Sequence, residues 1–254
     1  MKNWEKALAT FIKQYRNKPF FEGALLCGSY CSGNQNEFSD IDVYILIADD
    51  QHWRERGNTS INGFLIEYFT NPIYKIREEF RQDLQSGRTT SAGMFAHGKI
   101  LVDKNGLVQS LKNEALAVLK KPMPKYKTQD LALDFYVAWN SMDELKSLAR
   151  EKRSLGLVYN HLLENLVTLY SKGKRIPQLP ITKIEKIFDD TEYRKRYHIQ
   201  KLPNKKFMSL FLLALREQKV KNIQMLYDYV IKELGGFDIN HFKLRAILKG
   251  KTEN

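Results

Sequence analysis

The spacing of hydrophobic residues changes about halfway along the chain. In the first half, the apolar runs 24–27, 43–47 and 64–69 have the length of strands, and segments of helical periodicity lie between them. From residue 128 onward, apolar residues recur every three or four positions over long stretches, and no run has the character of a strand. The pattern therefore predicts a mixed α/β half followed by an all-helical half.

Two prolines separate these halves. Pro122 and Pro124 interrupt regular structure shortly after an apolar helical segment that ends at Leu119. We therefore expect a first domain over 1–120 and a second over 121–254. The expected helices of the first domain are 3–16, 73–84 and 107–119, and those of the second are 131–148, 155–170, 205–217 and 220–234.

Three acidic residues stand inside the apolar runs of the first domain. Asp40 and Asp42 open the run that continues through 43–47, and Glu67 lies in the middle of 64–69. Side chains alternate faces along a strand, so Asp40 and Asp42 project from the same side. Like charges this close together in an apolar setting are costly unless a cation compensates them. Because oxygen ligands favour Mg²⁺ or Mn²⁺, the pattern indicates a divalent metal site.

A glycine-serine turn precedes the acidic residues. The apolar run 24–27 ends at Gly28 and Ser29, where glycine lets the backbone approach a phosphate and serine offers a hydroxyl and an N–H group. The polar segment 30–39 connects this turn to the first carboxylate and closes with the small residue Ser39. Gly28, Ser29 and Ser39 are the candidate nucleotide-binding residues.

Taken together, these motifs resemble the nucleotidyltransferase superfamily, whose members include aminoglycoside and lincosamide nucleotidyltransferases, small antitoxin-type enzymes and DNA polymerase beta. That family's pattern is an apolar residue before Gly-Ser, then Asp-x-Asp about ten residues later, then a carboxylate between apolar residues on a later strand. Cys27-Gly28-Ser29, Asp40-Ile41-Asp42 and Ile66-Glu67-Tyr68 match the three parts in order. The resemblance is greatest to the two-domain aminoglycoside and lincosamide type. It implies an α/β (α+β) nucleotidyltransferase domain with a small mixed sheet, followed by an all-α helical bundle domain.

The resemblance also implies an activity, namely the metal-dependent transfer of a nucleoside monophosphate to a hydroxyl of an acceptor. The donor is ATP or another nucleoside triphosphate, and the family most often uses ATP. Asp40 and Asp42 would hold Mg²⁺ or Mn²⁺, and Gly28 and Ser29 would bind the triphosphate. Glu67 has two open roles, third metal ligand or general base. The implied acceptor is a small molecule such as an antibiotic.

The charge of the chain bears on the acceptor. Residues 1–120 hold 15 Lys and Arg against 14 Asp and Glu, whereas 121–254 hold 26 against 15, and the whole chain carries +12. A strongly basic second domain opposes polycationic aminoglycosides and favours a neutral acceptor, such as a lincosamide, or an anionic one, such as RNA or a protein. A non-catalytic nucleotide- or RNA-binding module is the alternative from another class, although binding alone does not require three carboxylates.

The cysteines, the histidines and the lengths of the apolar stretches bear on metal binding and on the cellular compartment of the protein. Its two cysteines, Cys27 and Cys31, flank the glycine-serine turn, and we interpret both as reduced packing residues rather than a disulfide or a zinc site. The five histidines show no metal-ligand spacing. No apolar stretch approaches the roughly 20 residues that cross a bilayer, and the N-terminus lacks the apolar core of a signal peptide. We expect a cytoplasmic protein without membrane contact.

Overall fold

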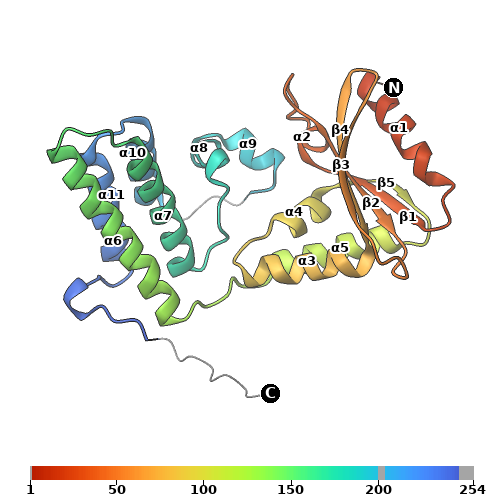
Figure 1. Cartoon of the computed structure of the whole chain (residues 1–254). Coiled ribbons are helices and arrows are strands. Elements are labelled where there is room, and N and C mark those ends of the chain that lie inside the picture. Colours follow the sequence, from red (N-terminus) through yellow and green to blue (C-terminus); the bar gives the residue numbers. More distant parts are fainter. Residues whose placement is uncertain (1, 200–203, 246–254) are drawn as a thin grey trace, which may run out of the picture. The chain divides into compact units, whose positions relative to one another are not determined.

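The computed structural model of the chain describes residues 2–199 and 204–245. It divides the chain into two compact units (Figure 1). Within the described residues, the first unit comprises 2–124 and 189–199, and the second comprises 125–188 and 204–245. The chain thus leaves the first unit just after the proline pair and later returns to it for a short segment. Nothing in the periodicity of the sequence indicates this return, because it depends on contacts between distant residues.

The first unit is built on a five-stranded sheet with the strand order β3-β4-β2-β1-β5. Its strands are β1 (Phe21–Leu26), β2 (Ile41–Ile47), β3 (Glu55–Ile61), β4 (Phe64–Pro72) and β5 (Lys99–Asp103). Its helices are α1 (Asn3–Arg16), α2 (Gly28–Ser32), α3 (Ile73–Gln85), α4 (Thr90–His97), α5 (Leu107–Leu119) and α9 (Thr191–Arg196). Strands β2 and β4 run parallel and the other neighbours are antiparallel, which confirms the predicted mixed sheet.

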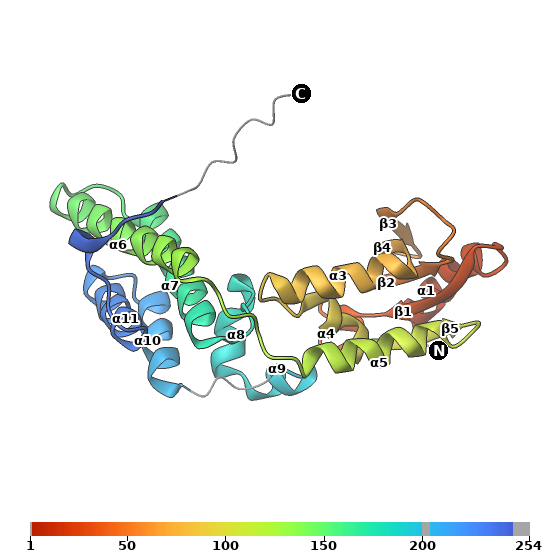
Figure 2. The same ribbon diagram turned by 90° about the horizontal axis from the view of Figure 1, so that it is seen from below.

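Helices cover both faces of this sheet, as Figures 1 and 2 show. Residues of α1 pack with Val43 and Ile45 of the central strand β2 on one face. Tyr44 and Leu46, which alternate with them, pack on the other face with α3, α4 and α5. A strand buried on both faces reads as a continuous apolar run, which explains the composition of 43–47. Because of this alternation, Asp42 lies on the face that α3, α4 and α5 cover.

Strand β3 was not predicted from the sequence. Its residues are mostly polar and mostly exposed, since it forms an edge of the sheet, and it therefore lacks the apolar signal of the other strands. It pairs with β4 through a tight hairpin whose two turn residues, Asn62 and Gly63, have positive φ values of 50° and 80°. Asparagine followed by glycine favours this turn. The hairpin places Asn58 directly opposite Glu67.

The second unit is helical throughout its described residues. Its helices are α6 (Thr128–Arg150), α7 (Gly156–Lys174), α8 (Ile184–Asp189), α10 (Lys205–Arg216) and α11 (Val220–Glu233), with 3-10 turns at Ile181–Lys183 and Ile239–His241. The core packs aromatic rings between helices, as where Tyr170 stacks on Phe207, and Tyr159 donates a hydrogen bond to the carbonyl of Ala214. The all-helical second half is thereby confirmed. Within the described residues, no helix combines the length and apolar character that crossing a membrane requires.

Candidate active site

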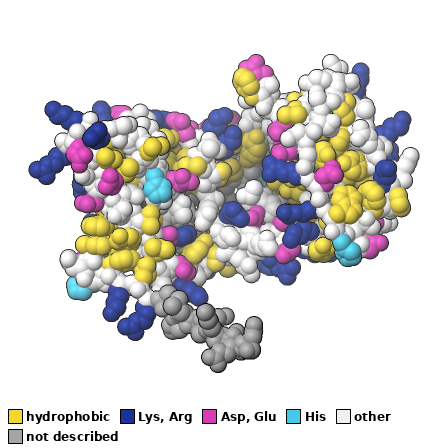
Figure 3. Space-filling model, in the orientation of Figure 1, with side chains coloured by type: hydrophobic (Ala, Val, Ile, Leu, Met, Phe, Trp, Pro, Cys, Tyr) yellow, Lys and Arg dark blue, Asp and Glu magenta, His cyan; other side chains and the backbone are white. Residues whose placement is uncertain are grey.

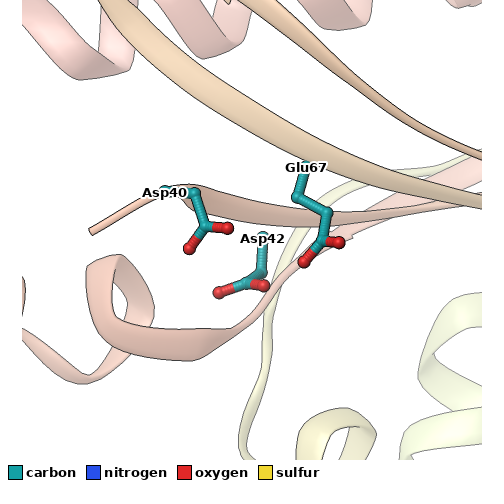
Figure 4. A group of neighbouring side chains, drawn as sticks. All are labelled: Asp40, Asp42 and Glu67. Atoms are coloured by element: carbon teal, nitrogen blue, oxygen red, sulfur yellow. The ribbon is translucent and has the colours of Figure 1, made fainter. Parts of the chain in front are cut away.

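Asp40, Asp42 and Glu67 converge on one face of the sheet in the first unit, near the start of β2. Parallel pairing of β2 and β4 sets Asp42 directly beside Glu67, and Asp40 directly precedes β2. Each residue offers a carboxylate oxygen, and these oxygens all lie within 4.8 Å of one another. Figure 4 shows the three carboxylates directed toward a common point. Strand alternation predicted that Asp40 and Asp42 share one side, and the register of β2 with β4 adds Glu67 to them.

Gly28 lies against this cluster in a conformation that favours glycine. Its φ is +65°, in the left-handed region that L side chains rarely adopt. A Cβ atom at Gly28 would also stand 1.8 Å from Oδ2 of Asp42, far inside van der Waals contact. The backbone is tied to the same residue, because the N–H of Cys27 donates to the carbonyl oxygen of Asp42 at 2.9 Å. Glycine is thus required here both by backbone conformation and by the space that Asp42 occupies.

The environment of Asp42 disfavours its ionised form. Burial, reinforced by the negative charges of Asp40 and Glu67, raises the pKa of Asp42 from 3.8 to about 6, although Arg56 opposes the shift. A bound cation would reverse this balance, because an opposite charge near a carboxylate favours its ionised form. A bound cation would therefore offset the repulsion among the three carboxylates and stabilise the ionised form of Asp42.

Arg56 on β3 is the residue of this site that the sequence did not reveal. Its Nη2 and Nε both donate to Oε1 of Glu67, at 2.6 Å and 3.0 Å. The guanidinium also lies 5.0 Å from the centre of the Phe69 ring, in cation–π geometry. This contact follows from the register of the β3–β4 hairpin. The sequence did not indicate it, because β3 was not predicted as a strand. Arg56 supplies one positive charge to a cluster of three carboxylates.

Ser29 and Ser39 have different surroundings. Ser29 is half-buried in the first turn of α2, and its hydroxyl has no hydrogen-bond partner among the described residues. Ser39 is half-buried in the loop before β2, where its hydroxyl accepts from the N–H of Asn36 at 2.9 Å and donates to Asn36 Oδ1 at 3.2 Å. Ser39 therefore closes a turn directly before the cluster. The roles of both serines in binding remain predictions.

The donor set fits a divalent cation that prefers oxygen. Three carboxylates with ligand atoms this close match the chemistry of Mg²⁺ or Mn²⁺. The nearby cysteines do not compete for this role. Both are free thiols, Cys27 is buried and Cys31 is half-buried, and burial raises the pKa of each above its ordinary value. A protonated thiol is a poor metal ligand.

Comparisons with known proteins do not identify a family for this chain. No protein-family model matches the chain, and no curated protein matches it either. Among solved structures, a nucleotidyltransferase-like protein from Exiguobacterium sibiricum is similar, with a TM-score of 0.43 and 13% sequence identity. The match covers 92% of this chain and 77% of that one. A likeness of this degree does not establish a function for this chain.

Proposed function

We propose that the protein is a metal-dependent nucleotidyltransferase that moves a nucleoside monophosphate, AMP from ATP, to a hydroxyl of a small-molecule acceptor. The observation that carries this proposal is the meeting of Asp40, Asp42 and Glu67 beside a glycine turn that leaves no room for a side chain. The same three motifs carry the resemblance to the nucleotidyltransferase superfamily. A structural acidic patch would need neither the close turn nor the burial of Asp42.

In this reaction the acceptor oxygen forms a bond to the α-phosphorus as the bond to the bridging oxygen breaks. Pyrophosphate leaves, and the acceptor hydroxyl loses its proton. Asp40 and Asp42 would hold the divalent cation, which supplies charge neutralisation and in-line alignment of nucleophile and leaving group. The turn at Gly28 and Ser29 would hold the triphosphate through backbone N–H groups and the serine hydroxyl.

Glu67 has two roles compatible with its position. As a third ligand it would complete the carboxylate set, and as a general base it would accept the proton of the acceptor hydroxyl. Arg56 binds Oε1 of Glu67 through two nitrogens, so Oε2 receives no hydrogen bond from that guanidinium. Oε2 is therefore the oxygen that we assign to the cation or to the acceptor.

A polyanionic acceptor such as RNA is the second candidate, favoured by the charge of the second half. Figure 3 shows several Lys and Arg side chains, with Asp and Glu side chains among them, over the end of the helical unit where α6 ends. Arg150, Lys152 and Arg153 are exposed there, and none of them forms an ion pair with a described residue. Such a surface would bind phosphate groups with strong salt dependence.

Mass spectrometry of the reaction products tests both candidates. The protein is incubated with Mg²⁺ and each nucleoside triphosphate in turn, together with hydroxyl-bearing antibiotics, RNA or proteins as acceptors. We expect one acceptor class to gain the mass of a nucleoside monophosphate, with release of pyrophosphate, and Asp42→Asn to abolish the gain. If folded protein binds no triphosphate and modifies no acceptor, the proposed activity is wrong.

A further inference from the structure

A segment from the second half of the chain contacts the end of α2 in the first unit. Residues of this segment, from Asp190 to Ile199, include α9 and the turn after it, and they belong to the first unit. Nη1 of Arg196 donates to the carbonyl of Gly33 at 3.1 Å and to Oδ1 of Asn34 at 3.3 Å. Arg196 thus binds the backbone and a side chain at the end of α2, the helix that begins at Gly28.

Helix α2 needs such outside support. It has five residues, none of which is buried, and Cys27 provides no side-chain cap at its start. A helix of this length is not stable by itself. It ends at Gly33, whose φ is +71°, and the N–H of Asn34 donates to the carbonyl of Ser29 at 2.9 Å. Because this bond joins the end of α2 to Ser29, a contact that fixes Asn34 also restrains Ser29.

A second contact joins the same segment to α2 by another route. The ring of His198, two residues after Arg196, stacks on His97 with centroids 3.9 Å apart and an interplanar angle of 11°. The carbonyl of His97 accepts a hydrogen bond from the thiol of Cys31 on α2 at 3.6 Å. Burial, with smaller contributions from His198 and Lys112, lowers the pKa of His97, which favours the neutral ring that stacks without charge repulsion.

From these contacts we infer that Arg196 is a positioning residue for the turn at Gly28 and Ser29, and therefore for the triphosphate of the donor nucleotide. This inference rests on the proposed function. Arg196 acts through Gly33 and Asn34 and does not itself touch the reacting atoms. The second half of the chain thereby contributes to the nucleotide site through a residue outside the three motifs that carry the resemblance.

Hydrogen exchange and nucleotide binding test this inference with two variants and a control. Arg196→Ala removes both hydrogen bonds, and Arg196→Lys keeps the charge while losing the planar donor geometry. The control is Lys195→Ala, because Lys195 is exposed and pairs with Glu192 of its own helix at 2.8 Å. Backbone exchange is measured over residues 28–34, and the affinity for Mg²⁺–ATP is measured by calorimetry without acceptor, so that no turnover is needed.

We expect Arg196→Ala to speed exchange over 28–34 and to weaken nucleotide affinity by about three- to tenfold, the size of one or two lost hydrogen bonds. Arg196→Lys should fall between Arg196→Ala and the wild type, and Lys195→Ala should match the wild type. With a known acceptor, the KM for ATP should rise while kcat at saturation stays unchanged.

Two results would overturn the inference. One is equal exchange over 28–34 in Arg196→Ala and Lys195→Ala, which would show that Arg196 does not restrain the turn. The other is faster exchange with unchanged nucleotide affinity, which would limit Arg196 to local packing. Failure of the wild type to bind nucleotide would instead contradict the proposed function, and the exchange data would still decide whether Arg196 holds α2.

Discussion

The two sides of the carboxylate cluster are built differently. On the β1 side, Gly28 lies against Asp42 with no space for a Cβ atom, and Cys27 donates a backbone hydrogen bond to the Asp42 carbonyl. On the β3 side, the carboxylate of Glu67 is bound by the guanidinium of Arg56, whose side chain is 69% exposed. Backbone contacts fix the β1 side of the cluster, whereas a solvent-exposed ion pair holds the β3 side.

This difference assigns different tasks to the two sides. A backbone contact between neighbouring strands changes only when the fold changes, so the β1 side suits the fixed geometry that phosphate transfer requires. An exposed ion pair is weak and exchanges its partner readily. The β3 side therefore suits the adjustments that accompany binding of a cation or an acceptor. Substitutions on the two sides should therefore have effects of different size.

Loss of one carboxylate charge should have the largest effect. Asp40→Asn or Asp42→Asn keeps the shape of the side chain but removes a charged ligand, and we expect transfer to fall by at least about 10²- to 10³-fold. Pyrophosphate release measures the activity and circular dichroism reports the fold. Asp50→Asn, an exposed change beyond the end of β2, is the control and should behave like the wild type. Activity of Asp42→Asn near the wild-type level would refute the role of the cluster.

Gly28→Ala should be the next most damaging change. The alanine must adopt a positive φ and push against Asp42, and we expect activity to fall by about 10²-fold because misplacement of reacting groups is costly. Gly106→Ala is the matched control, since Gly106 has a φ of +74° but nothing within 4 Å of an added Cβ. Both variants should lose stability, by about 1–2 kcal/mol for the strained backbone, as chemical denaturation would show. Equal activities of the two variants would contradict the contact with Asp42.

Arg56→Ala should have a smaller effect than the changes above. It should strengthen metal binding, whereas loss of a carboxylate weakens it. Without the guanidinium, the three carboxylates keep their full negative charge, and we expect tighter Mn²⁺ binding by about two- to fivefold, in the range of exposed ion pairs. Calorimetry with Mn²⁺ measures this in the absence of nucleotide. Arg54→Ala is a suitable control, because Arg54 is similarly exposed and pairs with Glu79 instead. Weaker Mn²⁺ binding in Arg56→Ala would show that Arg56 organises the site rather than competing for Glu67.

The smallest effect should be the pH dependence of stability in metal-free protein. The pKa of Asp42 is about 6 in the folded state, above its ordinary value of 3.8, so between these values the folded protein holds the proton more tightly than the unfolded chain. The free energy of unfolding should therefore fall as pH rises from about 4 to about 6, and Asp42 should add no further change above that. Solvent screening keeps the effect small, because the side chain is only partly buried.

Urea unfolding of the wild type and Asp42→Asn in the presence of a chelator measures this dependence. The difference between the two proteins isolates Asp42, since the other acids titrate in both. Added Mg²⁺ should reverse the trend in the wild type, because a cation favours the ionised carboxylate. Identical pH profiles for the two proteins would mean that Asp42 is not in the environment described.

The sequence predicted those features of the site that depend on residues close together in the chain. The alternation of a strand places Asp40 and Asp42 on one side, and the apolar run after them makes β2 a central strand. The partnership of Asp42 with Glu67 is a matter of register between distant strands, which periodicity does not give. Arg56 was missed because an exposed polar edge strand resembles a loop. The segment around Arg196 was missed because α8 and α9 are short and their contacts are long-range.

The pairing of Asp42 with Glu67 also limits how this region can vary in length. Successive residues of a strand face opposite ways, so one residue inserted between Phe64 and Glu67 would turn the third carboxylate to the α1 face of the sheet. The loop from Ala48 to Arg54 lies outside this register and can take added residues, provided that Asp49 still accepts from the N–H of Tyr74. In diverging copies of the gene, insertions and deletions should therefore collect in that loop and spare the start of β4.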